Sequence, residues 1–355
     1  MKIGILTFHW GTNYGGVLQA YALQWFLQRK GADVEIINYV PKTFRNSLFL
    51  CLKTRHLSLL KRNISEYVKE KKFSFFRKKV FSLSRRFCNP DSVNDFINNY
   101  DVIVVGSDQV WNPVIMNAEG KPYWLPAKGR TRKIAYAVSL GCTHYSEEER
   151  QRIAPWVKDF CGIGLRENTG VAEISHVIEK SSIEVKLTLD PTLLAGCAPF
   201  EQFLKKNAIE KSVFVYVLQQ KQKKIENEIA RLQEKGFCIN KAHSGFSRDL
   251  SVEEWLNGIY NSEFVVTNSY HGVAFSILFR KKFVVFPVEG RLSAMNDRIE
   301  TLLSRVGLLN RVYRDGQSVD ESLNGPIDWS DVEKKVKFFA EESSVFLERF
   351  INHEI

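Results

Sequence analysis

The chain has 355 residues, of which 44% are hydrophobic and 25% are charged. These values are ordinary for a globular protein of about two domains, and they exclude a chain that is disordered throughout. No uncharged apolar run approaches the roughly 18 residues of a spanning helix. The six cysteines never come closer than 19 positions, which excludes CxxC metal or redox motifs. The first residues lead into an apolar run without a signal-peptide cleavage site, so we expect a reduced, cytoplasmic protein.

The positive charge is concentrated in one segment. The net charge is +10, and residues 42–86 alone contain 14 Lys and Arg against two acids. Apolar residues interleave with these charges, which predicts a basic helical insert over 42–90. Such helices can be solvated and packed on the body, or they can form a basic amphipathic surface. We expect the segment 42–86 to face an anionic membrane, peripherally on the inner face of the plasma membrane. No nucleic-acid motif is present, and no nucleic acid is expected as a partner.

In chain order, short apolar runs alternate with amphipathic ones in the first half. A strand is predicted at 3–8, a helix at 17–29 that ends near Gly31, and a strand at 34–39. After the insert, strands are predicted at 102–106, 133–138, 163–165 and 185–189. Ser146 followed by Glu149 is a capping box that opens a helix.

The same alternation begins again in the second half. Strands are predicted at 213–218, 264–267 and 282–286, and helices at 223–235 and 273–279. Capping boxes at Ser251 and at Ser330 open two more helices, the last reaching about residue 350. This alternation predicts an α/β fold of two doubly wound parallel-sheet domains with an interdomain cleft. The predicted domains are 1–195 and 196–325, with a C-terminal helix over 326–355 that packs back across the hinge.

Loops at the carboxyl ends of strands are where such sheets bind ligands. The loop 10–16 contains three glycines before a helix, which lets a ligand approach the backbone and offers N–H groups to an anion. It is neither a Walker loop nor GxGxxG, and a tight turn is the alternative. The loop 106–113 places Asp108 and Asn112 beside Trp111. This suits a sugar site with a stacking plane, and equally a turn with helix caps.

Two further loops carry titratable groups. In the loop 162–169, Arg166 follows a short strand, and its guanidinium matches a carboxylate or phosphate. An ion pair with Glu167 or another acid within the domain is the alternative. In the loop 267–272, His271 precedes an apolar helix and is suited to proton transfer near neutral pH. His9, beside the first loop, is a weaker candidate.

At these loops the sequence resembles the polysaccharide pyruvyl transferase family. Five stretches carry the resemblance, in the expected order: TNYGGVLQA (12–20), GSDQVWNP (106–113), LRE (165–167), LDPT (189–192) and NSYHG (268–272). The resemblance implies an architecture like that of the GT-B glycosyltransferases, and a ketal-forming pyruvyltransferase. Phosphoenolpyruvate would be the donor and co-substrate, a sugar of a lipid-linked polysaccharide precursor the acceptor, and no further cofactor or metal would be needed.

The resemblance also implies roles for individual residues. The family's arginine and catalytic histidine fall on Arg166 and His271. Some members carry an arginine two positions before the histidine, where this chain has Ser269, so we expect a second cation from Arg298 or Arg291. The predicted donor site comprises Arg166, Asn268, Ser269, Tyr270, Gly272 and Arg298. The predicted acceptor site comprises Asn13, Tyr14, Gly15, Gly16, Asp108, Trp111 and Asn112.

Two other functions fit the same pattern. A glycosyltransferase would use a nucleotide sugar, and Glu289 is a candidate for holding its ribose. A non-catalytic protein on the same scaffold would bind lipid or another polyanion through the basic insert and would not use His271.

Overall fold

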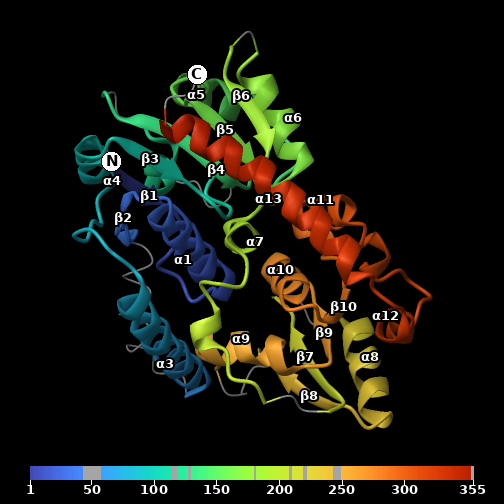
Figure 1. Ribbon diagram of the computed structural model, residues 1–355. Helices are drawn as coiled ribbons and strands as arrows, with labels where there is room; N and C mark the ends of the chain where they lie inside the picture. Colours follow the sequence, from blue (N-terminus) through green and yellow to red (C-terminus); the bar gives the residue numbers. More distant parts are fainter. Residues whose placement is uncertain are drawn as a thin grey trace. The chain divides into compact units, whose positions relative to one another are not determined.

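A computed structural model describes residues 1–42, 57–113, 118–126, 129–179, 181–207, 210–218, 222–242 and 249–352, and the side chains of all these except 57–63, 118–119 and 291–292. The chain forms two compact units (Figure 1). Unit 1 comprises Met1–Ala195 and Phe338–Ile355, and unit 2 comprises Gly196–Lys337. Most of the basic insert's first part, residues 43–56, lies outside the described residues.

Unit 1 is built on a parallel sheet with the strand order β2-β1-β3-β4-β5-β6. The order reverses between β1 and β3, which makes this the topological switch point of a doubly wound sheet. The strands are β1 (Lys2–Leu6), β2 (Asp33–Ile36), β3 (Val102–Val105), β4 (Arg132–Val138), β5 (Gly162–Leu165) and β6 (Glu184–Leu187). The parallel α/β class predicted from the alternation is confirmed.

Both faces of this sheet are covered in its centre, which is why a central strand such as β3 is wholly apolar and buried. Alternate side chains of β3 enter two different cores, Ile103 and Val105 on one face and Val102 and Val104 on the other. The helices of unit 1 are α1 (Tyr14–Arg29), α3 (Leu57–Val80), α4 (Pro90–Phe96), α5 (Glu147–Val157), α6 (Asn168–Val177) and α7 (Pro191–Ala195), with 3-10 turns η1 (Ile97–Asn99) and η2 (Ala118–Trp124).

Local signals set the ends of several helices. Asn13 caps α1 by accepting from Gly16 N, and Gly31, at φ +84°, follows its last turn as predicted. The capping box at Ser146 opens α5, and the one at Ser251 opens α9 (Val252–Asn261). The predicted cap at Ser330 is wrong. Asp328 caps α13 (Trp329–Asn352) instead, because its carboxylate accepts from two backbone N–H groups of the first turn.

Unit 2 has a smaller parallel sheet with the order β10-β9-β7-β8. Its switch point lies between β7 and β9. The strands are β7 (Ser212–Tyr216), β8 (Cys238–Lys241), β9 (Phe264–Thr267) and β10 (Lys282–Val285). The other elements are η3 (Glu201–Phe203), α8 (Lys223–Glu234), α10 (Tyr270–Leu278), η4 (Gly290–Asn296), α11 (Asp297–Val306), η5 (Leu309–Arg311) and α12 (Val319–Asn324).

The last helix, α13, contributes to both units. From Phe338 onward its residues belong to unit 1, where Phe346, Leu347 and Phe350 join the core on one face of the sheet. Gly162 in β5 makes this packing possible, since a Cβ there would lie 2.4 Å from the Phe350 ring. Within the described residues, no helix combines the length and the hydropathy that crossing a bilayer requires.

Candidate active site

The predicted loops lie at the switch points of the two sheets. In unit 1, the loops after β1 and β3 leave neighbouring strands at the point where the strand order reverses. In unit 2, the loop after β9 leaves the sheet beside the end of β7. Ligands of open α/β sheets bind outside the carboxyl ends of strands at such points. Each unit therefore carries a candidate site of its own.

Buried hydrogen bonds hold the two loops of unit 1 together. Gln19, in α1, donates to Thr7 Oγ1 at 2.9 Å and accepts from Ser107 N at 3.2 Å. Thr7 Oγ1 in turn donates to Ser107 O at 2.9 Å. Gln19, Thr7 and Ser107 are completely buried, so these bonds replace lost hydration and fix the spacing of the loops.

Asp108 lies beside the first turn of α1. Its backbone is in the left-handed region, at φ +71°, which Asp tolerates better than most residues. A Cβ at Gly16 would lie 3.2 Å from Asp108 Oδ2, so the glycine lets the carboxylate approach the helix backbone. The other oxygen, Oδ1, accepts from Gln109 N at 2.8 Å. A carboxylate at this position interacts favourably with the positive end of the helix dipole.

Arg166, after β5, lies in a buried ion pair. Its Nη1 donates to Asp190 Oδ2 at 2.8 Å, and its Nη2 lies 3.4 Å from Asp108 Oδ1. The side chains of Arg166 and Asp190 are both 0% exposed. Asp190 also accepts from Ser107 Oγ at 3.0 Å and from the backbone and hydroxyl of Thr192. The sequence left open an ion pair of Arg166 with an acid of its own domain. The structure contains such a pair, and the acids are Asp190 and Asp108. Direct contact of Arg166 with a donor stays a prediction.

Two residues predicted in the acceptor site are core residues, which corrects the prediction for both. Trp111 is completely buried, stacks on Trp124 with ring centroids 4.5 Å apart, and donates from Nε1 to Tyr123 O. Its ring therefore offers no face to a sugar. Tyr14 is also completely buried, with its ring 4.9 Å from that of Phe73 in α3.

Other residues of the predicted acceptor site stay at the loops. Asn13 is exposed at the start of α1, followed by the buried Gly15 and Gly16. Asn112 is buried, and its side-chain nitrogen donates to Gln109 Oε1 at 2.9 Å. Among the polar residues predicted here, Asn13 is exposed and the carboxylate of Asp108 is 11% exposed.

In unit 2, His271 lies in the first turn of α10. It is 6% exposed, and its ring meets that of Tyr270 edge to face. Asn268, just before the helix, bonds both the N–H and the carbonyl of Leu218 and so ties the end of β9 to that of β7. Ser269 N donates to Thr267 Oγ1. Among the described residues of the first turn of α10 there is no acid, and Ser269 makes no side-chain cap there.

Of the two arginines predicted as a second cation for the donor, the structure places the side chain of Arg298. Arg298 is 7% exposed in the first turn of α11, a helix that contacts α10 within unit 2. The loop before it is held by two hydrogen bonds between Asn296 and the backbone of Val288, each 2.8 Å long. The side chain of Arg291 lies outside the described residues. Arg298 as a donor ligand stays a prediction.

A family comparison extends over both candidate sites. The sequence model of the family described as polysaccharide pyruvyl transferase matches residues 13–290. The chain belongs to this family. The match begins at the cap of α1 and ends after β10, so it contains every predicted donor and acceptor residue except the two candidates for the second cation, Arg291 and Arg298.

Several solved structures resemble this chain in fold. A UDP-bound S. aureus protein, MnaA, has a TM-score of 0.53 at 11% identity, covering 99% of this chain and 97% of its own. A putative UDP-N-acetylglucosamine 2-epimerase from Listeria monocytogenes has a TM-score of 0.54 at 8% identity, covering 99% of this chain and 97% of its own. The UDP-GlcNAc 2-epimerase of Methanocaldococcus jannaschii has a TM-score of 0.52 at 11% identity, covering 96% of this chain and 92% of its own. The fold is GT-B-like, as predicted, and these identities carry no more than the fold. No curated protein matches the sequence.

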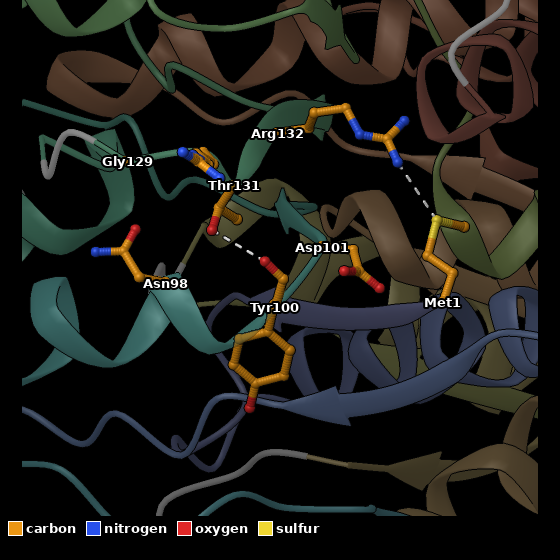
Figure 2. A pocket seen from close by; sticks show the side chains of 8 residues that line it. Met1, Asn98, Tyr100, Asp101, Gly129, Thr131 and Arg132 are labelled. Carbon is orange, nitrogen blue, oxygen red and sulfur yellow. Dashed lines mark hydrogen bonds between the residues drawn. The ribbon is translucent and has the colours of Figure 1, made fainter.

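Two other features of the chain fall outside the candidate sites. His9 is buried, donates from Nδ1 to Thr7 O, and has Nε2 3.2 Å from Asn38 Oδ1, so it is structural. Its burial lowers the pKa of His9 from 6.5 to about 4. A hollow of 740 Å³ (Figure 2) lies beside Met1, Asp101 and Arg132, at the amino ends of β1, β3 and β4. That is the opposite edge of the sheet from the switch-point loops.

The sequence reasoning assigned no role to three residues of the unit 1 site. Asp190 stands within one of the family stretches, and an acid directly after the strand predicted at 185–189 was the signal available for it. Gln19 and Ser107 also lie in family stretches. Neither is charged, and their importance follows only from hydrogen bonds to residues that are distant in the sequence.

Proposed function

We propose that the protein transfers the enolpyruvyl group of phosphoenolpyruvate to a sugar of a lipid-linked polysaccharide precursor and forms a pyruvate ketal. Membership of the pyruvyl transferase family supports a transferase of this kind. The observation that carries the proposal is the position of His271, in the first turn of a helix at the switch point of unit 2. An imidazole in the first turn of a helix suits proton transfer to a small dianion, because the positive end of the helix dipole favours an anion there.

The reaction balances with two proton transfers. The methylene carbon of phosphoenolpyruvate accepts one proton and becomes a methyl group, while one sugar hydroxyl loses its proton and bonds to C2. The C2–O bond to phosphate then breaks, and phosphate leaves with the electron pair. A second hydroxyl bonds to C2, and its proton leaves with the phosphate. The products are the ketal and inorganic phosphate, so no oxidant, metal or further cofactor enters the balance.

The donor is proposed to bind in unit 2. The N-terminus of α10 carries no acid in its described first turn, so its dipole remains available to the donor's phosphate or carboxylate. His271 would deliver the proton to the methylene carbon. Asn268, Ser269, Tyr270 and Gly272 would shape the backbone around the anion, and Arg298 would supply the second cation.

The acceptor is proposed to bind in unit 1. There the start of α1 already faces the Asp108 carboxylate, which makes that helix end unsuitable for a dianion and suitable for neutral hydroxyls. Asp108 would accept a hydroxyl hydrogen, and Asn13 and Asn112 would orient the sugar. In this scheme Arg166 acts by fixing Asp108 and Asp190.

The glycosyltransferase alternative has less support from the residues it needs. Glu289, its candidate for holding a ribose, is paired with Lys224, whose Nζ lies 2.5 Å from Oε1. A thermal-shift comparison of phosphoenolpyruvate with nucleotide sugars separates the two functions. Stabilisation by a nucleotide sugar and none by phosphoenolpyruvate would favour the glycosyltransferase.

The proposal is tested by measuring phosphate release from phosphoenolpyruvate in the presence of an oligosaccharide acceptor. The His271→Ala variant should lose about 10²–10⁴-fold in kcat, the range typical of a proton-transfer residue. His176→Ala is the matched control, because His176 lies exposed in the last turn of α6. Wild-type turnover by His271→Ala would remove this residue from the mechanism, and no phosphate release by the wild type with any acceptor would overturn the function.

A further inference from the structure

Helix α3, part of the basic insert, presents two different faces. One face packs on α1, where Phe73 lies against Tyr14 and Phe76 lies 6.2 Å from Tyr21, ring to ring. On the same face, the buried Lys69 has its Nζ 5.3 Å from the centre of the Tyr14 ring. Arg77 pairs with Glu70 and donates to Gly11 O at 3.1 Å.

The opposite face of α3 is apolar and exposed. Phe75 is 67% exposed, Ile64 48% and Val68 46%. At the helical repeat of about 100° per residue, these three side chains fall within an arc of about 40°. All three stay exposed within the part of the chain that the structure describes. Exposed apolar groups aligned on one helix mark an interaction surface more often than isolated ones do.

Lysines border this apolar strip. Lys71 and Lys78 are exposed on the same side as Phe75, and Lys71 Nζ lies 5.2 Å from the centre of the Tyr67 ring. By the same repeat, Glu66 lies on the side of the helix that Phe73 occupies. Long lysine side chains beside an apolar strip can hold their ammonium groups at a headgroup layer while the strip enters the acyl region.

We propose that the outer face of α3, made by Ile64, Tyr67, Val68, Lys71, Phe75 and Lys78, docks on an anionic lipid bilayer. Charge favours this occupant over a second copy of the chain. A two-fold symmetric contact through this face would bring each lysine toward the partner's lysines. The surface belongs to α3 alone, so the proposal stands or falls independently of the transferase reaction.

The test is sedimentation of the full chain with vesicles of phosphatidylcholine alone or with about one-third phosphatidylglycerol. Wild type should bind only the anionic vesicles and should dissociate at about 1 M salt, where the screening length is about 3 Å. Lys71→Gln with Lys78→Gln should weaken binding about thirtyfold. Phe75→Ser should weaken it about tenfold, because the ring no longer enters the acyl region.

Helix α13 provides matched controls of equal length, 24 residues. Phe338 is 61% exposed there, and Lys334 is also exposed, so Phe338→Ser and Lys334→Gln should leave vesicle binding unchanged. Equal wild-type binding to neutral vesicles would overturn the proposal, as would unaltered binding by the α3 variants. Two further results would also overturn it: a self-association that Phe75→Ser abolishes, which would assign the face to a second copy, and binding of soluble heparin in place of anionic vesicles.

Discussion

Replacing Asp190 with Asn separates two roles of Arg166, as a structural cation and as a donor ligand. In the structure Asp190 and Arg166 are both completely buried and 2.8 Å apart. Asp190→Asn removes the charge and leaves the guanidinium with Asp108, 3.4 Å away and slightly exposed. Removing one partner of a buried pair costs about 3–5 kcal/mol, and we expect about 3 kcal/mol here because Asp108 remains.

The loss is measured as the free energy of unfolding, from urea titrations followed by tryptophan fluorescence. Five of the seven tryptophans lie in unit 1, so the signal reports mainly on that unit. Asp331→Asn is the matched control, because Asp331 pairs with Lys335 on the surface, where the two side chains are 52% and 43% exposed. Such a pair contributes about 0–1 kcal/mol.

Kinetics of the same variant complete the experiment. With Arg166 as a structural cation, Asp190→Asn should raise KM for the acceptor, because Asp108 loses its fixed position, and should leave KM for phosphoenolpyruvate nearly unchanged. The reasoning is refuted if Asp190→Asn is as stable as the Asp331→Asn control. A stable variant with a raised KM for phosphoenolpyruvate would return Arg166 to the donor site.

Three further predictions concern single residues. Trp111→Ala should lower the free energy of unfolding by about 3–5 kcal/mol in the same urea titration, and an equally stable variant with a weakened acceptor would show a sugar contact instead. Burial lowers the pKa of His9 from 6.5 to about 4 in the folded protein. Between these two pH values His9 therefore takes up a proton in the unfolded chain and stays neutral in the folded one. Stability should therefore fall by about 2.5 kcal/mol from pH 8 to 4.5, more steeply than in His9→Gln, and parallel pH profiles would contradict this. Gly16→Ala should raise KM for the acceptor, because the new Cβ meets Asp108 Oδ2 at 3.2 Å as well as Phe8 O at 3.3 Å; an unchanged KM would separate Asp108 from acceptor binding.

The sequence predicted the structure best at positions where a single residue type restricts the backbone to few conformations. Capping boxes at Ser146 and Ser251 and the glycine after α1 marked helix ends correctly, because each signal acts within one turn. At α13 two adjacent capping patterns competed, and Asp328 rather than Ser330 makes the bonds. Strand β8 was not predicted, because Cys238–Lys241 is a polar, mostly exposed edge strand without an apolar run.

The candidate site shows the same limit. Strand ends placed Asp108 and His271 correctly at switch-point loops, since the order of elements along the chain is readable. Trp111 was assigned to a sugar, because a tryptophan next to polar residues looks the same in sequence whether it faces a ligand or the core. The pairing of Arg166 with Asp190 joins residues 24 positions apart, and no local pattern reports which of several acids a buried cation selects.

The division of α13 between the units has a consequence for biosynthesis. Unit 2 is continuous in the sequence, so it has all of its residues once Lys337 has left the ribosome. Most of unit 1 precedes unit 2 in the sequence, yet Phe346, Leu347 and Phe350 of its core are made only after the whole of unit 2. Nascent domains usually mature in the order of their synthesis. Here unit 1 must wait until unit 2 has been translated, and an amino-terminal fragment ending at Ala195 would expose the sheet face that those three side chains cover.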